Sequence, residues 1–170
     1  MSVLVGGNRP VNRFYDFEIL EFLDGTVTVA NATTYRIADP TGYDQFTGNF
    51  TYDANGVLIG GTITGWTRVT SGGTEFTLSG VNYPVALFLA DLVTNDSAGL
   101  LNAVLGNNDK ITGSTQGDIL SGYGGKDTIN GAGGNDAIYG LQGDDSLLGK
   151  GGGPFEISCP NCRHKFTANI

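Results

Sequence analysis

Aspartate residues recur every nine positions near the end of this 170-residue chain. The five are Asp109, Asp118, Asp127, Asp136 and Asp145. A carboxylate is a hard, charged oxygen donor of the kind that Ca²⁺ prefers. A backbone that coils regularly brings side chains of one spacing into register, because every copy repeats the same local structure. The spacing therefore predicts a row of ligands for a hard cation.

The residues around each aspartate repeat as well. An aliphatic side chain stands two positions later, at Ile111, Leu120, Ile129, Ile138 and Leu147. A glycine-rich half precedes the aspartate, where glycine permits a tight turn with φ > 0 and lets carbonyl groups approach a metal. The aspartate half predicts a short strand whose aliphatic residue points inward, and stacked copies bury what one copy cannot. The alternative interpretation of this segment is a flexible linker, but such linkers do not carry aliphatic residues at a fixed spacing.

The unit G-x-G-G-x-D-x-U-x resembles the nonapeptide of the repeat-in-toxin (RTX) family of secreted calcium-binding proteins. The resemblance implies a right-handed parallel β-roll, with two nonapeptides to a turn and each Ca²⁺ between the loops of repeats n and n+2. It pairs Asp109 with Asp127, Asp118 with Asp136 and Asp127 with Asp145, which implies about three calcium ions. The glycines that it places in these loops are Gly122, Gly124, Gly125, Gly131, Gly133, Gly134, Gly140 and Gly143. The two early loops, 107–108 and 114–117, contain less glycine than the family pattern.

Residues 1–103 predict a β-rich module. Apolar and polar residues alternate in several short runs, such as Phe50–Tyr52 and Phe76–Leu78. Asn55-Gly56 between two runs is a hairpin signal. We therefore expect an antiparallel meander or sandwich of four or more strands. The module is similar to one often found ahead of bacterial RTX repeats.

Two short helices are expected between this module and the repeats. Pro84 precedes an apolar run over 85–93, and Pro suits the first turn of a helix. Asp96 can cap a second helix over 97–105, which Gly106 closes. These helices would cover the open end of the roll. The predicted fold is all-β with three parts: the module at 1–103, the roll at 104–153 and a tail at 154–170.

The tail contains both cysteines of the chain, Cys159 and Cys162. Their C-x-x-C spacing is similar to one knuckle of a zinc ribbon. A closed zinc site needs four ligands, and only His164 is at hand as a third. We therefore expect no Zn²⁺ within one chain. A disulfide, a site completed by another chain and an added extension all stay open.

The sequence offers little for catalysis. No histidine precedes His164, so we expect no Ser-His-Asp triad and no zinc-protease helix, and we expect that the protein is not an enzyme. An acidic cluster (Asp16, Glu18, Glu21 and Asp24) is compatible with a glycosidase or, more simply, with an exposed face. The aromatic residues Trp66, Tyr43, Tyr52 and Tyr83 are compatible with a glycan-binding platform or with core packing.

The net charge of −8 disfavours nucleic acid and anionic membranes as partners and favours cations. No apolar stretch is long enough for a membrane span, and residues 1–10 lack the pattern of a standard signal peptide. With the RTX resemblance, we expect a secreted, extracellular bacterial protein exported by type I secretion, whose roll folds on Ca²⁺. Self-association as a surface layer, filament or adhesin, and a cell-surface glycan partner, are the alternatives.

Overall fold

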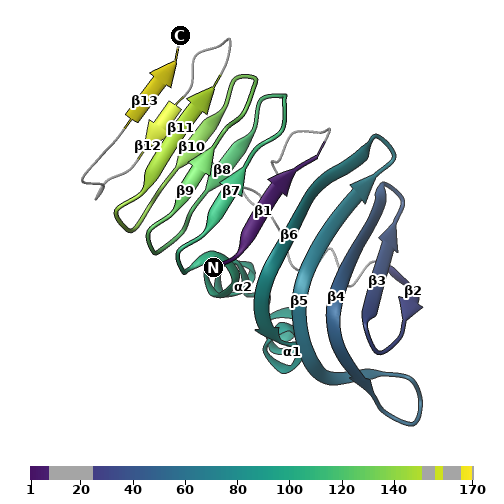
Figure 1. Cartoon of the computed structure of the whole chain (residues 1–170). Helices are drawn as coiled ribbons and strands as arrows, with labels where there is room; N and C mark the ends of the chain where they lie inside the picture. Colours follow the sequence, from purple (N-terminus) through teal and green to yellow (C-terminus); the bar gives the residue numbers. More distant parts are fainter. Residues whose placement is uncertain (8–24, 151–155, 159–165, 170) are drawn as a thin grey trace.

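The computed structural model describes residues 1–7, 25–150, 156–158 and 166–169. Two sheets and two helices make up these residues. The larger sheet has ten strands in the order β13-β11-β9-β7-β1-β6-β5-β4-β3-β2, and the smaller has three in the order β12-β10-β8 (Figure 1). The prediction of an all-β fold, with an antiparallel meander followed by a parallel β-roll, is confirmed.

An antiparallel meander forms the first half of the larger sheet. Its strands are β2 (Thr26–Ala30), β3 (Thr34–Asp39), β4 (Gly42–Tyr52), β5 (Leu58–Thr70) and β6 (Gly73–Pro84). Each pairs with the next in sequence order. The β4–β5 turn uses the predicted Gly56, whose φ is 79°, and the Asp53 carboxylate accepts the N–H of Val57 at 2.8 Å. The turn chemistry therefore fixes the hairpin register.

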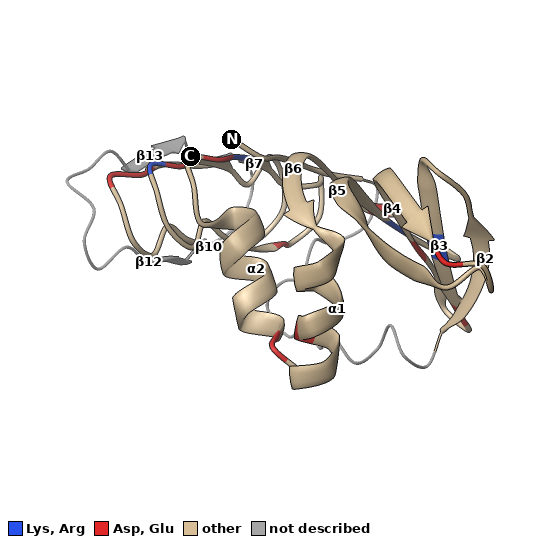
Figure 2. Ribbon diagram, turned by 90° about the horizontal axis from the view of Figure 1, so that it is seen from below, with Lys and Arg blue, Asp and Glu red and all other residues tan. Residues whose placement is uncertain are grey.

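Helices α1 (Val85–Thr94) and α2 (Ser97–Leu105) follow the meander. Pro84 is the residue before α1, and the Asp96 carboxylate caps α2 by accepting the N–H of Gly99 at 2.7 Å. Both helices lie on the same side of the larger sheet as the smaller sheet does (Figure 2). None of the helices among the described residues is long and apolar enough to cross a membrane.

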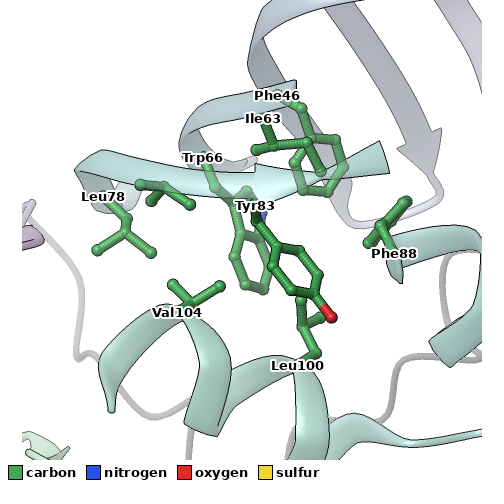
Figure 3. Close-up of a pocket in the computed structure, with 9 residues that line it drawn as sticks. Phe46, Ile63, Trp66, Leu78, Tyr83, Phe88, Leu100 and Val104 are labelled. Atoms are coloured by element: carbon green, nitrogen blue, oxygen red, sulfur yellow. The ribbon is translucent and has the colours of Figure 1, made fainter. Parts of the chain in front are cut away.

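The helices cover an aromatic core. Trp66 packs on Phe46 with ring centroids 5.6 Å apart and meets Phe76 edge-on at 5.1 Å. Trp66 and Tyr83 also line a small apolar pocket between the sheet and the helices (Figure 3). Only 4% of Trp66 and 5% of Tyr83 are exposed. The hypothesis of a glycan-stacking platform is therefore wrong for these two rings, because the meander uses them as its core.

The repeat block coils between the two sheets. Strands β7 (Lys110–Thr112), β9 (Thr128–Asn130) and β11 (Ser146–Lys150) join the larger sheet, while β8 (Ile119–Ser121) and β10 (Ala137–Tyr139) lie in the smaller one. All pairings among them are parallel, and partners are 18 residues apart, as for Ile111 with Ile129. Two nonapeptides thus make one turn of a β-roll.

Parallel strands continue beyond the repeats. Strand β12 (Glu156–Ser158) pairs with β10, and β13 (Phe166–Asn169) pairs with β11. Backbone pairing with the roll thus extends past Gly153, because it does not require the aspartate and glycine residues of the repeat. The division into three domains stays a prediction.

Strand β1 (Val3–Gly6) joins the two halves of the larger sheet. It pairs antiparallel with β6 of the meander and parallel with β7 of the roll. The meander and the roll are consequently one hydrogen-bonded sheet across the expected boundary at residue 103.

Candidate calcium site in the repeat loops

The interior of the roll is a stack of aliphatic side chains. The inward residues of the five repeats are at most 3% exposed. They are Ile111, Leu120, Ile129, Ile138 and Leu147. Because each lies two residues after an aspartate, this packing fixes where every aspartate enters its strand. All five aspartates are buried as well, at 4% exposure or less.

The structure brings together the three aspartate pairs that the RTX resemblance implied. Asp127 Oδ1 accepts the backbone N–H of Asp109 at 2.8 Å, and Asp145 Oδ1 accepts that of Asp127 at 2.9 Å. On the other side of the roll, Asp136 Oδ1 accepts the N–H of Asp118 at 3.1 Å. Each carboxylate therefore uses one oxygen to tie its loop to the loop 18 residues earlier.

The second oxygen of two aspartates is left over. Asp109 Oδ2 and Asp127 Oδ2 are two of the three buried side-chain N or O atoms that lack a hydrogen-bond partner among the described residues. Burying an unpaired polar oxygen is costly, so each such atom calls for a ligand. The donor type fits Ca²⁺, which binds carboxylate and carbonyl oxygens.

The first glycine of a repeat keeps space open beside the carboxylate five residues later, as Gly122 and Gly131 show. A Cβ at Gly122 would lie 2.4 Å from Asp127 Oδ2 and 3.0 Å from the carbonyl oxygen of Gly140. A Cβ at Gly131 would lie 2.1 Å from Asp136 Oδ2. Glycine thus leaves a space lined by carboxylate and carbonyl oxygens, which a larger residue would fill.

A second set of glycines shapes the loops. Gly125, Gly134 and Gly143 have φ values of 110°, 105° and 137°, which side-chain-bearing residues rarely adopt. A Cβ at Gly143 would lie 1.5 Å from the carbonyl oxygen of Gly125, so successive loops are in close contact. Gly124 and Gly133 differ, since a Cβ there would approach no atom closer than 3.7 Å.

Burial makes these carboxyl groups harder to ionise. Burial raises the pKa of Asp109, Asp136 and Asp145. Burial, together with the neighbouring charges of Asp145 and Asp109, raises the pKa of Asp127 to about 7. A cation in the loops would remove this penalty, because an opposite charge favours the ionised form.

The Asp118 loop departs from the others. Ser114 donates its N–H to Asp118 Oδ2 at 2.6 Å and its hydroxyl to Asp118 Oδ1 at 3.0 Å. Sequence reasoning saw that this loop has less glycine but missed that its serine would bond the carboxylate. The signal was available, since a serine four residues before an aspartate occurs here and in none of the later repeats.

The remaining candidate ligands of the sequence fall partly outside the described residues. Within the described ranges, no three His, Cys, Asp or Glu side chains gather into a metal-binding group. The cysteine pair Cys159 and Cys162, with His164, lies outside the described residues. The acidic cluster at 16–24 also lies outside them.

Comparison with known families agrees with this geometry. The family model described as the RTX calcium-binding nonapeptide repeat matches residues 105–138 and 124–153 of the chain. Neither a search of curated proteins nor a search of solved structures gave a match. The repeat block belongs to the RTX calcium-binding nonapeptide repeats, and the prediction of an RTX-type calcium-binding repeat protein is confirmed.

Proposed function

We propose that this protein is a non-enzymatic structural protein whose β-roll folds when its loops bind Ca²⁺. The observation that carries the proposal is the ladder of buried aspartates, in which Asp109 Oδ2 and Asp127 Oδ2 have no hydrogen-bond partner within the described part of the chain. The residues that would hold the ions are the aspartate pairs and the loop carbonyl groups beside them. When bound, Ca²⁺ supplies positive charge and accepts oxygen ligands.

The protein's own residues explain why folding would depend on the ion. In the metal-free fold, the Asp127 carboxylate is buried between two other carboxylates, which raises its pKa. Short strands of three residues, such as β9 and β10, add little stability alone. Binding free energy therefore becomes folding free energy, as in other sites that do not exist in the unfolded chain.

We further propose that the protein works outside a bacterial cell after type I secretion, as RTX proteins typically do. Extracellular calcium-binding modules have dissociation constants of roughly 10⁻⁴–10⁻³ M. A roll of this affinity stays loose where calcium is scarce and becomes ordered where calcium is abundant. The calcium concentration would thus decide where the protein folds.

Counting bound ions in matched variants tests the proposal. We expect about three ions, one for each aspartate pair, by isothermal titration calorimetry with CaCl₂. Asp127 belongs to two pairs and Asp136 to one. Asp127→Ala should therefore lose two ions and Asp136→Ala one. Asp144→Ala is the control, because this exposed carboxylate lies next to Asp145 but outside the ladder. Equal stoichiometry in all variants would contradict the proposal.

A second candidate is calcium-dependent self-association as a surface layer or filament. The ten-stranded sheet ends in β2 and β13, and Val27 on β2 is 47% exposed. Terminal strands offer backbone groups for pairing with another chain. Sedimentation at increasing protein concentration with calcium tests it. Larger species would favour assembly, and a monomer at every concentration would exclude it.

A further inference from the structure

The strand at the start of the chain repeats the pattern of the distant calcium repeats. Residues 2–6 read Ser-Val-Leu-Val-Gly, and residues 109–113 read Asp-Lys-Ile-Thr-Gly. The parallel register aligns them residue by residue, with Val3 opposite Lys110 and Leu4 opposite Ile111. The first segment is therefore a repeat strand with serine in place of aspartate, although 107 residues separate Ser2 from Asp109.

Backbone hydrogen bonds confirm the equivalence of the two segments. The carbonyl of Ser2 accepts the N–H of Lys110 at 3.0 Å, just as the carbonyl of Asp109 accepts that of Thr128 at 2.8 Å. The N–H of Ser2 donates to Asp109 Oδ1 at 2.5 Å, as the N–H of Asp109 donates to Asp127 Oδ1 at 2.8 Å. Ser2 thus stands one step before Asp109 in the same ladder.

Packing places the segment inside the roll. Leu4 and Ile111 are both 1% exposed, and Ile129, the next residue in their column, is fully buried. A Cβ at Gly6 would lie 2.6 Å from the carbonyl carbon of Gly113, so the backbones of the two segments approach closely there too. In Figure 1, β1 (purple) lies between β7 and β6.

Serine suits this first position in the ladder. Ser2 is 5% exposed, and its hydroxyl donates to the carbonyl of Val104 near the end of α2 at 2.9 Å. It thereby satisfies one of the carbonyl groups that a helix leaves unpaired at its end. A serine closes the stack against α2 without adding a further buried charge.

We propose that residues 2–6 are a calcium-coupled rung of the β-roll and that Ser2 is a positioning residue for the calcium ligand Asp109. The N–H of Ser2 holds one carboxylate oxygen of Asp109. This leaves the buried Oδ2, which has no hydrogen-bond partner among the residues that the structure describes, for the ion. This inference rests on the proposed calcium function. It adds that the site formed by Asp109 and Asp127 is completed from the opposite end of the sequence.

A consequence follows for the rest of the protein. Strand β1 also pairs with β6 over four residues, from Val3 with Ser79 to Gly6 with Phe76. An ion bound at Asp109 would therefore favour docking of β1, and docked β1 links the roll to the meander. Calcium would in this way order the sheet junction as well as the repeats.

Two substitutions at one position test the role of Ser2. Ser2→Pro removes the N–H donor, and Ser2→Ala keeps it while removing the hydroxyl. Intact mass must show that Met1 is retained, so that the nitrogen of residue 2 is an amide. In calorimetric titration with CaCl₂, we expect Ser2→Pro to weaken one site roughly tenfold, because a hydrogen bond to a charged group is lost. Ser2→Ala should stay within about twofold of the wild type.

A double-mutant cycle separates positioning from a merely structural effect. In an Asp109→Ala background, Ser2→Pro should cause no further loss of affinity, because the two changes act on one interaction. Equal, additive losses in both backgrounds would overturn the role of Ser2. Wild-type affinity at every site in Ser2→Pro would also overturn it. A wild-type protein that binds no calcium would instead defeat the proposed function itself.

Hydrogen exchange supplies a measurement that does not depend on the proline variant. We expect calcium to slow hydrogen exchange of the β1 amides in the wild-type protein. In Asp109→Ala, calcium should no longer slow this exchange. Asp53, half-buried in the distant β4–β5 turn, supplies a control variant, Asp53→Ala, which should keep the effect. Protection of β1 that is independent of calcium would overturn the coupling.

Discussion

Replacing Asp127 by asparagine should change stability in opposite directions with and without calcium. Asparagine keeps an oxygen that can accept the N–H of Asp109, a bond of 2.8 Å in the wild-type protein. It removes the negative charge that burial and the charges of Asp145 and Asp109 disfavour. The same charge is what a calcium ion would need. The metal-free variant should therefore be more stable than the wild type, and the calcium-loaded variant less stable.

The size of both effects can be estimated. Burial and charge raise the pKa of Asp127 to about 7 from 3.8. At about 1.4 kcal/mol for each pKa unit, keeping this carboxylate ionised lowers the free energy of unfolding by at most about 4 kcal/mol at pH 8. An incompletely bonded amide would offset roughly 1–3 kcal/mol of the gain. With calcium at a hundred times its dissociation constant, each site adds about 2.7 kcal/mol, so losing two sites costs about 5 kcal/mol.

Urea unfolding measures both effects, once in chelator and once in saturating calcium. Trp66 fluorescence and far-UV circular dichroism serve as the two signals. Trp66 is the single tryptophan of the chain and is buried in the meander, while circular dichroism also reports the roll. Asp144→Asn is the matched control, since it removes an exposed charge from the loop that precedes Asp145. Destabilisation of Asp127→Asn by equal amounts in both conditions would refute the reasoning, as would a similar reversal in the control.

Three further predictions concern other features of the fold. Gly134→Ala should destabilise the calcium-loaded protein by about 2 kcal/mol or more in urea unfolding. The reason is that φ of Gly134 is 105° and a Cβ there would lie 2.3 Å from a backbone carbon. Gly133→Ala should be tolerated, because a Cβ there would come no closer than 3.7 Å to another atom. Asp44→Ala should cost roughly 3–5 kcal/mol with or without calcium, because it leaves Arg68, a 2.8 Å ion-pair partner, buried with less compensating charge; an effect that depended on calcium would contradict this. The metal-free protein should lose stability as pH rises from about 4 to about 7, because the pKa of Asp127 is higher in the folded than in the unfolded protein. Thermal melts in chelator measure this, and a melting temperature that rises over the same pH range would contradict it.

The sequence predicted the roll and its aspartate pairs because the signal there is periodic. Each nine-residue unit defines both a loop and a strand. In the unit 122–130, for example, Asp127 ends the glycine-rich loop and Ile129, two residues later, points inward from the strand. Family resemblance supplied the step from n to n+2, and the 18-residue register bears this geometry out. Local chemistry was equally clear at Gly56 and Asp96, where a turn and a helix cap need particular residues.

The order of strands could not be predicted in the same way. Strand β1 is four residues long, and its partners in β6 and β7 lie 70 or more residues away. No local pattern announces such pairing, although the match of Ser-Val-Leu-Val-Gly to the repeat could have suggested it. Strands β12 and β13 pair without the repeat's aspartate and glycine pattern, so periodicity missed them as well.

Burial likewise needed the tertiary structure. Trp66 lies on β5, where the pairing register with β6 shifts between Ile63 and Gly65 and where the adjacent residues Gly65 and Trp66 are both buried. An irregular register of this kind defeats a simple period of two, because it moves later side chains to the other face. The choice between a surface platform and a core residue therefore stayed open until the helices were placed over the ring.

Far-UV circular dichroism during a calcium titration of chelator-treated protein tests the central claim most directly. The account predicts a gain of β signal on adding CaCl₂, reversed by excess chelator, retained in Asp144→Ala and lost in a double variant with alanine at Asp127 and Asp136. A full β signal in chelator that calcium does not change would contradict the claim that the roll folds on the ion.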